Sequence, residues 1–390
     1  MRIVVAHESL DTEGGVETYL LSVIHALRHR GHQIALMYYH RSDRTATPLH
    51  ACAHVAFGIE ERGVDAAFNE LDAWRPDVAF SHNMGPLEID RRLLARWPVV
   101  KMLHGYFGTC VSGLKMHAFP APQACHRTFG PACLALYVPR RCGELSVGAI
   151  VKGYRWAAEQ RRLWPRYVRT IVASEHMRAE MVRHGAPDQR LDVLPLFSTV
   201  QSNDVAPGAE RDTVLFAGRM TTLKGGHVLV GAAARAARML GRPVNLIMAG
   251  DGPQKEKWRA LALSLRVPLE LTGWLSPDDR PRVYARGVLA AVPSLWPEPF
   301  GLSGLDAAAL GRPAIAFDVG GIREWLADGV TGRLVAPDAG EDGLASGIAS
   351  MLDRPEECAL MGQRAFRVSR RLSVAQHVER LEAVLRSAAA

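Results

Sequence analysis

Short apolar runs of strand length alternate with segments of helical periodicity along most of this 390-residue chain. The segment 16–30, for example, has apolar residues at helical spacing and is ended by Gly31. Runs of strand length lie at 2–6, 34–39, 77–80, 99–103 and 170–173 in the first half, and at 214–217, 244–249, 269–272, 289–292 and 314–317 in the second. This alternation predicts an α/β chain with parallel sheets that helices cover on both faces, the doubly wound or Rossmann-like arrangement.

A polar stretch that contains Pro and Gly, residues 198–212, separates the two series of runs. Its composition is typical of a linker. We therefore predict an N-terminal domain over 1–197 and a C-terminal domain over 213–373. Because ligands of doubly wound sheets bind at the carboxyl ends of the strands, both domains are expected to face a central cleft.

The composition argues against several classes of protein. Apolar residues make up 48% of the chain and charged residues 22%, which is unlike an intrinsically disordered chain. No run approaches the ~20 apolar residues that a membrane-spanning helix needs. The apolar run 1–6 is interrupted by His7-Glu8-Ser9 before a signal peptide could form, and six cysteines are too few for a disulfide scaffold of this size. We expect a cytoplasmic protein.

Four of the six cysteines fall in a stretch, 105–150, that has no clear period. They are Cys110, Cys125, Cys133 and Cys142, with His104, His117 and His126 near them in sequence. Structural zinc sites usually show a tight pair of ligands, whereas these cysteines are 15, 8 and 9 residues apart. We interpret the stretch as a long loop or excursion with small buried thiols. Zinc binding is the alternative.

Basic residues are concentrated in one part of the chain. Residues 91–190 hold 17 Lys and Arg against 5 Asp and Glu, although the whole chain has a net charge of only +7. Within 152–169 the basic side chains interleave with Tyr and Trp, a pattern that suits an anionic membrane surface, at its inner face, or an anionic acceptor. The alternative is a solvated helix whose aromatic residues pack inward. No recognition motif for nucleic acid accompanies the charge.

Two cations flank a predicted strand-to-helix turn in the second half. Gly218-Arg219 follows the run 214–217, and Lys224-Gly225 precedes a helical segment. Both cations can then reach one anion, to which the helix N-terminus adds free N–H groups and partial positive charge. A diphosphate is the natural ligand, and an ordinary surface turn with two solvated cations is the alternative.

Two acidic residues follow the run 289–292. Glu298 stands between two prolines, and Asp306 lies eight residues further on, in a predicted helix over 301–310. Acids at this spacing can bind different hydroxyls of one extended polyol, while N–H groups around Gly301 can contact phosphate. The alternative for Glu298 is an acid that complements the helix dipole.

Together these motifs resemble the family-four retaining glycosyltransferases, which have the two-domain GT-B fold. The matching residues are Gly14-Gly15-Val16-Glu17, Gly31-His32, Gly218-Arg219, Lys224-Gly225, Gly250-Asp251-Gly252-Pro253, Glu298-Pro299-Phe300-Gly301, Gly320-Gly321 with Glu324, and Asp328-Gly329-Val330-Thr331-Gly332. Each motif alone is weak, but their order and their places on the predicted elements are specific. One position departs from the family, which usually has Glu where this chain has Asp306.

The resemblance implies a role for each matching residue. Arg219 and Lys224 would neutralise the diphosphate of a nucleotide-sugar, beside Gly218 in the same turn. Glu298 would bind hydroxyls of the transferred sugar and Asp306 those of the ribose. The backbone of Phe300, Gly301 and Leu302 would line the sugar and phosphates, Gly15 would allow close approach to the diphosphate, and His104 would lie beside the reacting sugar. The terminal helix, within 374–390, is expected to pack back on the N-terminal domain.

The implied activity is transfer of a hexose-type sugar, with retention, from a UDP- or GDP-linked donor. A saccharide, a lipid-linked glycan or a small metabolite would be the acceptor. No motif supplies a covalent nucleophile, so the donor phosphate would act as base on the reacting face, without metal or cofactor. Two alternatives are a non-catalytic relative that binds nucleotide-sugar and a nucleotide-sugar epimerase of related architecture. A dehydrogenase is disfavoured, because Gly250-x-Gly252 lacks the third glycine of the dinucleotide fingerprint.

Overall fold

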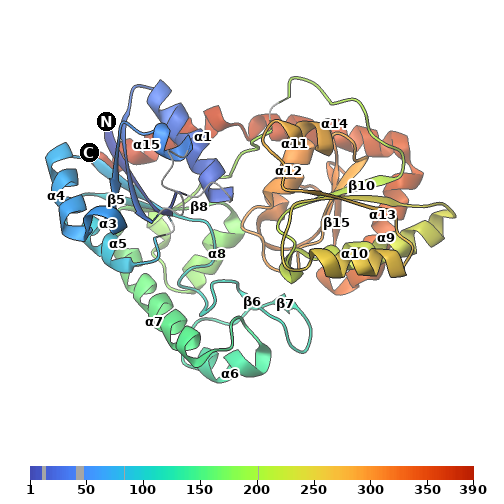
Figure 1. Ribbon diagram of the computed structural model, residues 1–390, viewed down its shortest axis with the longest axis horizontal. Coiled ribbons are helices and arrows are strands. Elements are labelled where there is room, and N and C mark those ends of the chain that lie inside the picture. Colours follow the sequence, from blue (N-terminus) through green and yellow to red (C-terminus); the bar gives the residue numbers. More distant parts are fainter. Residues whose placement is uncertain (11–14, 41–47, 83, 201) are drawn as a thin grey trace. The chain divides into compact units, whose positions relative to one another are not determined.

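The computed structural model describes residues 1–10, 15–40, 48–82, 84–200 and 202–390. The chain divides into two compact units, shown in Figure 1. The first unit contains Met1–Lys115, His126–Pro195 and Val374–Ala390, and the second contains Met116–Cys125 and Leu196–Ser373. The segment Met116–Cys125 thus groups with the second unit, whereas the sequence analysis placed all of 1–197 in the N-terminal domain.

The first unit is built on a seven-stranded sheet in the order β3-β2-β1-β4-β5-β8-β9, and every pair in it is parallel. The strands are β1 (Arg2–Ser9), β2 (Gln33–His40), β3 (Val55–Gly58), β4 (Val78–Ser81), β5 (Val99–Leu103), β8 (Arg169–Val172) and β9 (Leu191–Val193). Their central residues are buried on both faces, which explains the continuous apolar runs. The strand order reverses between β1 and β4, so the carboxyl ends of these strands form a topological switch point.

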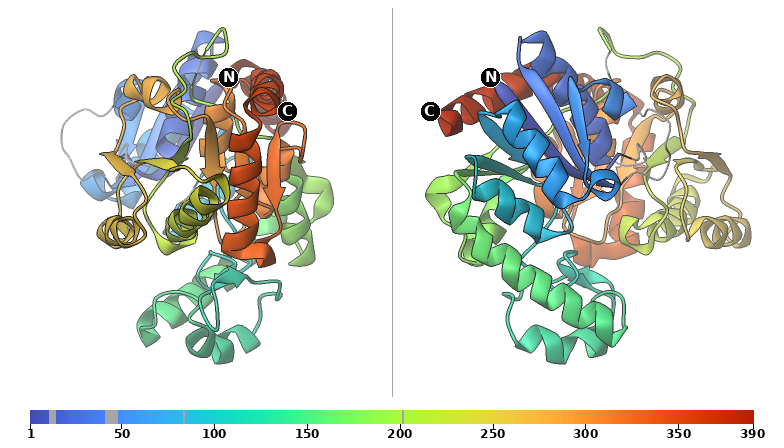
Figure 2. Two further views of the ribbon diagram at one scale, coloured as in Figure 1. Left: turned by 90° about the vertical axis from the view of Figure 1, so that its right-hand side faces the viewer. Right: turned by 60° about the vertical axis from the view of Figure 1, so that its left-hand side comes forward.

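Helices cover both faces of this sheet, as Figure 2 shows. The helices of the first unit are α1 (Gly15–His29), α2 (Pro48–Ala51), α3 (Ile59–Arg62), α4 (Val64–Trp74), α5 (Leu87–Leu94), α6 (Ala132–Arg140), α7 (Val147–Leu163), α8 (Glu175–Arg183) and α15 (Val374–Ala389), with 3-10 turns Trp164–Arg166 and Asp188–Arg190. The terminal helix α15 packs on α1. Glu382 of α15 accepts hydrogen bonds from Arg30 and His32 at 2.6 and 3.0 Å, and Tyr19 pairs with His377 at 2.8 Å.

The second unit has a six-stranded parallel sheet in the order β12-β11-β10-β13-β14-β15. Its strands are β10 (Thr213–Ala217), β11 (Asn245–Ala249), β12 (Leu269–Gly273), β13 (Leu289–Val292), β14 (Ala314–Phe317) and β15 (Gly332–Val335). Its helices are α9 (Gly226–Leu240), α10 (Lys255–Ser264), α11 (Asp279–Tyr284), α12 (Leu302–Ala308), α13 (Gly340–Asp353) and α14 (Pro355–Arg371), with 3-10 turns Thr222–Lys224, Gly320–Glu324 and Pro337–Ala339. The order reverses at β10 and β13, which makes a second switch point.

The stretch 105–150 is more regular than the sequence suggests. It contains an antiparallel hairpin, β6 (Met116–His117) with β7 (Gln123–Ala124), and the helix α6. The inner side of α6 packs Tyr137 against Ile150 and Val111 in a small core of its own. The following helix α7 begins at Val147, because Ser146 accepts the N–H of Ala149 at 3.2 Å and caps the helix there.

Candidate active site

Lys224 and Glu298 lie on two loops that follow neighbouring strands of the second unit. Lys224 ends the 3-10 turn after β10, and Glu298 lies in the loop after β13. The carboxyl ends of parallel strands meet at one edge of the sheet, so the fold brings both loops to the switch point. The Lys224 ammonium donates to Glu298 Oε1 at 2.6 Å. The structure therefore joins the two side chains that the sequence suggests for phosphate and sugar.

Two glycines allow these loops to approach one another closely. A Cβ on Gly225 would lie 1.8 Å from the carbonyl oxygen of Pro293, and one on Gly320 would lie 2.0 Å from that of Glu298. Both residues also have positive φ, which L-residues with a side chain rarely adopt. The backbone of Leu295 donates to Leu223 at 2.8 Å, which ties the two loops together. The backbone positions of Lys224 and Glu298 are thus fixed by main-chain contacts.

The Glu298 carboxylate is buried and oriented by three donors. Its Oε1 accepts from Lys224, from the indole N–H of Trp296 at 2.9 Å and from the hydroxyl of Ser294. Its Oε2 has no hydrogen-bond partner among the described residues. Lys224 is 30% exposed and lies 5.5 Å from the centre of the Trp296 ring. The carboxylate therefore has one oxygen held by the protein and one available as a hydrogen-bond acceptor.

Arg219 lies in the same connection as Lys224 but is exposed. No carboxylate is paired with its guanidinium in the described part of the chain, and no contact joins it to Lys224. The backbone beside it is ordered by the next loop, because Gly218 donates to Ala249 at 2.9 Å and Met220 donates to Asp251 at 2.7 Å. Arg219 is therefore an unpaired cation held on a well-supported turn.

The segment 300–302 follows Glu298 and was expected to contact the donor through its backbone. The Phe300 side chain is buried, and its carbonyl accepts the Trp325 indole N–H at 2.6 Å. That carbonyl is therefore already occupied. Gly301 has φ of 81° and precedes α12, whose first residue, Leu302, is half-buried. The first N–H groups of α12 have no acceptor within the helix itself.

Asp306 is engaged by the segment that enters the second unit. Its Oδ1 accepts from the Ser198 hydroxyl at 2.7 Å and from the Thr199 N–H at 3.1 Å. Arg280 lies 3.9 Å from Oδ2 and donates to the Thr199 hydroxyl at 2.8 Å. Burial raises the pKa of Asp306, and Ser198 and Arg280 partly oppose this shift. The shorter acid thus ties the start of the predicted linker to α12, a contact that sequence spacing did not suggest.

In the first unit, the structure places Gly15 at the first residue of α1 and His104 directly after β5. A Cβ on Gly15 would meet no described atom within 4 Å, so the packing of the protein does not itself require glycine there. Gly14, which belongs to the same motif, lies outside the described residues.

His104 pairs with a second histidine, His82, that follows the neighbouring strand β4. His82 Nδ1 lies 2.9 Å from His104 Nε2. Lys101 donates to the His82 carbonyl and is held by buried Asp90 at 2.7 Å. Removal from water lowers the pKa of His104 to about 3, with smaller effects of His7, Lys101 and His377 in the same direction. Both His82 and His104 are therefore neutral at physiological pH.

Sequence reasoning missed the residues that support the site: Ser294, Trp296, His82, Ser198 and Arg280. Ser294 and Trp296 precede Glu298 by four and two residues. A search of the sequence for hydrogen-bond donors near this acid, which stands between two prolines, would have found them. His82 directly follows β4, and His104 directly follows the neighbouring strand β5, so the two positions could be related once the strand order was known. The hydrogen bonds of Asp306 with Ser198 and Thr199 span more than 100 residues and leave no local signal.

The described residues contain no group of three or more His, Cys, Asp or Glu placed to hold a metal ion. All six cysteines are free thiols, and Cys133 and Cys142 pack against the small core of Tyr137 and Ile150. The zinc alternative therefore lacks a ligand set among these residues.

The aromatic side chains within 152–169 are used inside the fold. Trp164 and Tyr167 are buried, Tyr154 packs on Phe129, and the Trp156 indole donates to Gly85 at 2.7 Å. Their packing corresponds to the inward-facing alternative. A role at a membrane surface would require these aromatic side chains to point outward, whereas here they make contacts inside the protein.

Two family models match consecutive parts of the chain. Residues 13–197 match Glycosyltransferase Family 4, and residues 199–368 match Glycosyl transferases group 1. The two matched ranges meet close to the division between the units.

Relatives and solved structures agree with these matches. Alpha-D-kanosaminyltransferase of Streptomyces kanamyceticus is 29% identical over 54% of this chain and 57% of its own length. D-inositol 3-phosphate glycosyltransferase of Segniliparus rotundus is 35% identical over 46% of this chain and 43% of its own. The matches with these curated relatives thus span about half their length.

Anabaena Alr3699/HepE, solved with UDP and glucose, has a TM-score of 0.72 at 20% identity and covers 99% of this chain and 100% of its own. Sucrose-phosphate synthase from Thermosynechococcus elongatus has a TM-score of 0.70 at 17% identity, over 99% and 98% of the two chains. At these identities the likeness shows the fold, which is GT-B.

Proposed function

We propose that this chain, which belongs to the group 1 glycosyltransferases, transfers a hexose-type sugar from a nucleotide-diphosphate donor with retention of configuration. The observation that carries the proposal is the Lys224–Glu298 pair, which presents a cation and a free carboxylate oxygen at one switch point. A diphosphate needs the cation, and a sugar hydroxyl needs the acceptor. Few other ligands need both at this separation.

The second unit supplies the donor contacts in this proposal. Arg219 and Lys224 bind the two phosphates, and their charge stabilises the nucleoside diphosphate as it leaves. The free Oε2 of Glu298 accepts a hydroxyl of the transferred sugar, while Oε1 stays with Ser294, Trp296 and Lys224. The N–H groups at the start of α12 add donors for a phosphate or sugar oxygen.

The low pKa of His104 guides the assignment of the base. A group with a pKa of about 3 is a weak acceptor of protons at neutral pH, so His104 acts as a neutral hydrogen-bonding group beside the sugar. The bond between the sugar C1 and the donor phosphate oxygen breaks, and the acceptor oxygen bonds to C1 on the same face. The acceptor proton passes to the departing phosphate oxygen, so no protein base is required.

The identity of donor and acceptor is proposed from the relatives. Alr3699/HepE was solved with UDP and glucose, which favours a UDP-sugar here, with GDP-sugar as the second choice. The curated relatives are named for transfer of kanosamine and for D-inositol 3-phosphate, so a small polar metabolite is a candidate acceptor beside a saccharide or lipid-linked glycan.

A nucleotide screen tests the proposal without knowledge of the acceptor. Thermal unfolding is followed with UDP, GDP, ADP and dTDP and with their sugars, in the presence of a chelator. We expect one nucleoside diphosphate to raise the melting temperature, and its sugar conjugate to raise it further. If a product is obtained, NMR of its anomeric proton reports retention or inversion. Absence of stabilisation by every nucleotide would overturn the proposal.

A further inference from the structure

Exposed apolar side chains are concentrated on α6, in the loop that follows it and at the start of α7. Among the described residues, fifteen large apolar side chains are exposed, and five of them fall within the 18 residues 134–151. These five are Leu134, Val138, Leu145, Val147 and Val151, and we refer to them as the α6–α7 face. Val147 is 77% exposed, the highest value of the five. Such concentration of apolar surface marks an interaction site more often than chance exposure does.

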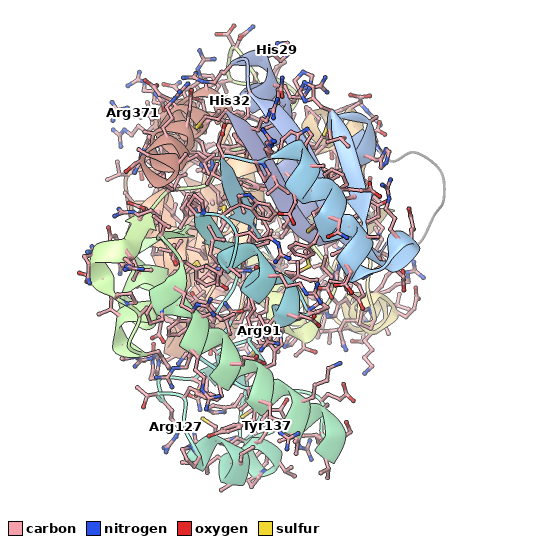
Figure 3. The ribbon with its side chains drawn as sticks, turned by 90° about the vertical axis from the view of Figure 1, so that its left-hand side faces the viewer. His29, His32, Arg91, Arg127, Tyr137 and Arg371 are labelled. Carbon is pink, nitrogen blue, oxygen red and sulfur yellow. The ribbon has the colours of Figure 1, made fainter. Side chains whose placement is uncertain are left out.

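The α6–α7 face is separate from the core of this part of the first unit. On α6, Cys133 and Tyr137 point to the small core, whereas Leu134 and Val138 form a different stripe at i, i+4. On α7, Ile150 packs inward, and Val147 and Val151 form an exposed stripe of the same spacing. Figure 3 shows α6 with Tyr137 and the nearby Arg127 at the end of the first unit remote from its sheet. The five exposed side chains are thus not needed to complete the local core.

The segment that carries the α6–α7 face is also basic. Residues 127–155 contain five basic residues, Arg127, Arg140, Arg141, Lys152 and Arg155, against one acidic residue, Glu144. Lys152 and Arg155 are exposed on α7, and no carboxylate pairs with either in the described part of the chain. The surface combines aliphatic side chains with unpaired cations, and this complements an anionic, partly apolar partner.

We propose that the α6–α7 face is a peripheral docking surface for an anionic lipid bilayer. Aliphatic side chains enter the boundary between headgroups and acyl chains, while long Lys and Arg side chains remain at the level of the phosphates. The described residues include no helix that is long and apolar enough to cross a bilayer, so the contact lies on the surface. The face lies N-terminal to most of the segment 152–169 and uses none of its aromatic residues.

The docking surface is independent of the proposed reaction, although it favours a lipid-linked acceptor. None of Val147, Val151, Lys152 and Arg155 is among the residues to which the proposed function gives a role. Membrane binding can therefore be measured directly, and its failure leaves the proposal of glycosyl transfer intact. Equally, an inactive enzyme that binds vesicles would leave the docking surface standing.

Vesicle co-sedimentation tests this proposal. The full chain is mixed with vesicles of phosphatidylcholine alone or of equal parts phosphatidylcholine and phosphatidylglycerol, at low and high salt. We expect binding to the mixed vesicles at low salt, weaker binding at high salt, and little binding to phosphatidylcholine alone. Equal binding to both vesicle types, or none to either, would overturn the proposal.

Variants locate the surface. The apolar variant is Val147→Glu with Val151→Glu, and the charge variant is Lys152→Glu with Arg155→Glu. Each is expected to weaken binding to the mixed vesicles by about tenfold or more. The matched controls lie in the second unit, Leu263→Glu with Met239→Glu and Arg238→Glu with Lys257→Glu, and all four residues are exposed.

Three outcomes decide the matter once circular dichroism shows that the variants are folded. Loss of binding in both test variants with controls unchanged supports the surface. Wild-type binding in the test variants overturns it. The proposal is also overturned if the wild type does not bind vesicles and forms a dimer that the apolar variant dissociates. The face is then an interface between two copies.

Discussion

Lys224 and Glu298 stand 74 residues apart in the chain and share a 2.6 Å ion pair at the carboxyl edge of the second unit's sheet. The pair links the cation proposed for phosphate to the acid proposed for sugar. Because each side chain orients the other, the two are expected to act as one unit rather than as independent contacts.

Loss of either member should therefore remove most of the activity. We expect Lys224→Ala and Glu298→Gln each to lower turnover of the donor by about 10²–10³-fold, in the range found when one transition-state donor is removed. Because they act on the same pair, the double variant should lose less than the product of the single losses. Steady-state rates of the four proteins give the coupling directly. Independent, multiplicative losses would contradict the account.

The donors to Glu298 Oε1 should affect substrate affinity. Ser294→Ala and Trp296→Phe each remove one hydrogen bond to this carboxylate and keep most of the side chain. A hydrogen bond to a charged group contributes about 1.5–3 kcal/mol, so we expect donor affinity to fall by about tenfold or more. Calorimetric titration with the nucleotide-sugar measures this loss. Ser276→Ala, which alters an exposed serine elsewhere in the unit, is the matched control and should bind like the wild type.

Removal of the Asp306 carboxylate should lower the stability of the protein, because this group is buried and hydrogen-bonded. Asp306→Ala leaves the Thr199 N–H without its acceptor and restricts the Ser198 hydroxyl to the Val200 carbonyl, which should cost about 1–3 kcal/mol in the free energy of unfolding. Asp306→Asn keeps an acceptor oxygen and should cost less. Urea unfolding of both variants measures these costs. Unchanged stability in Asp306→Ala would show that the contact to 198–199 is dispensable.

The same two variants separate stability from ribose binding. If Asp306 also binds the ribose, as the family resemblance implies, the folded Asp306→Asn protein should bind the nucleoside diphosphate more weakly. Unaltered affinity would limit Asp306 to tying the entering segment to α12.

Acid should destabilise the first unit before it protonates most carboxylates. Burial lowers the pKa of His104 to about 3 and that of His377 to about 4, whereas both titrate near 6.5 in the unfolded chain. The unfolded chain therefore binds more protons between these values, and stability falls as pH decreases from about 6.5 toward 4. Each such histidine contributes about 1.4 kcal/mol per pH unit in that range.

Urea unfolding at pH 7.5 and pH 5 checks this dependence. His104→Gln should reduce the loss between these pH values by about 2 kcal/mol, since one titrating group is removed. His29→Gln alters an exposed histidine on α1 and should leave the loss unchanged. A wild-type stability that does not fall at pH 5 would show that these histidines are accessible to protons in the folded state.

Most strands of both sheets could be predicted from the sequence, because buried parallel strands appear as continuous apolar runs. The strands β3, β9 and β15 were missed. Each lies at an edge of its sheet and is only partly buried, so it does not appear as a continuous buried apolar run. The stretch 105–150 was read as a loop because α6 has apolar residues on two faces, one for its own core and one exposed, which hides the helical period.

The sequence could point to those candidate site residues that directly follow a predicted strand. Lys224 and Glu298 each follow a strand, so the alternation places both at the carboxyl edge of one sheet. Their direct contact depends on β10 and β13 being neighbours, which the sequence did not predict. The pairing of Asp306 with Ser198 and the stacking of His82 beside His104 depend on tertiary packing between distant segments. No periodicity within a short window reports such contacts.

The most direct test of the central claim is release of nucleoside diphosphate from a nucleotide-sugar, measured for the wild type and Glu298→Gln in parallel with a chelator present. Water can take the place of the acceptor hydroxyl when no acceptor is added, so the assay needs only the donor. We predict slow release from one UDP- or GDP-sugar by the wild type, and a rate at least about 10²-fold lower for Glu298→Gln. Equal rates in the two folded proteins, or no release from any donor, would contradict the account.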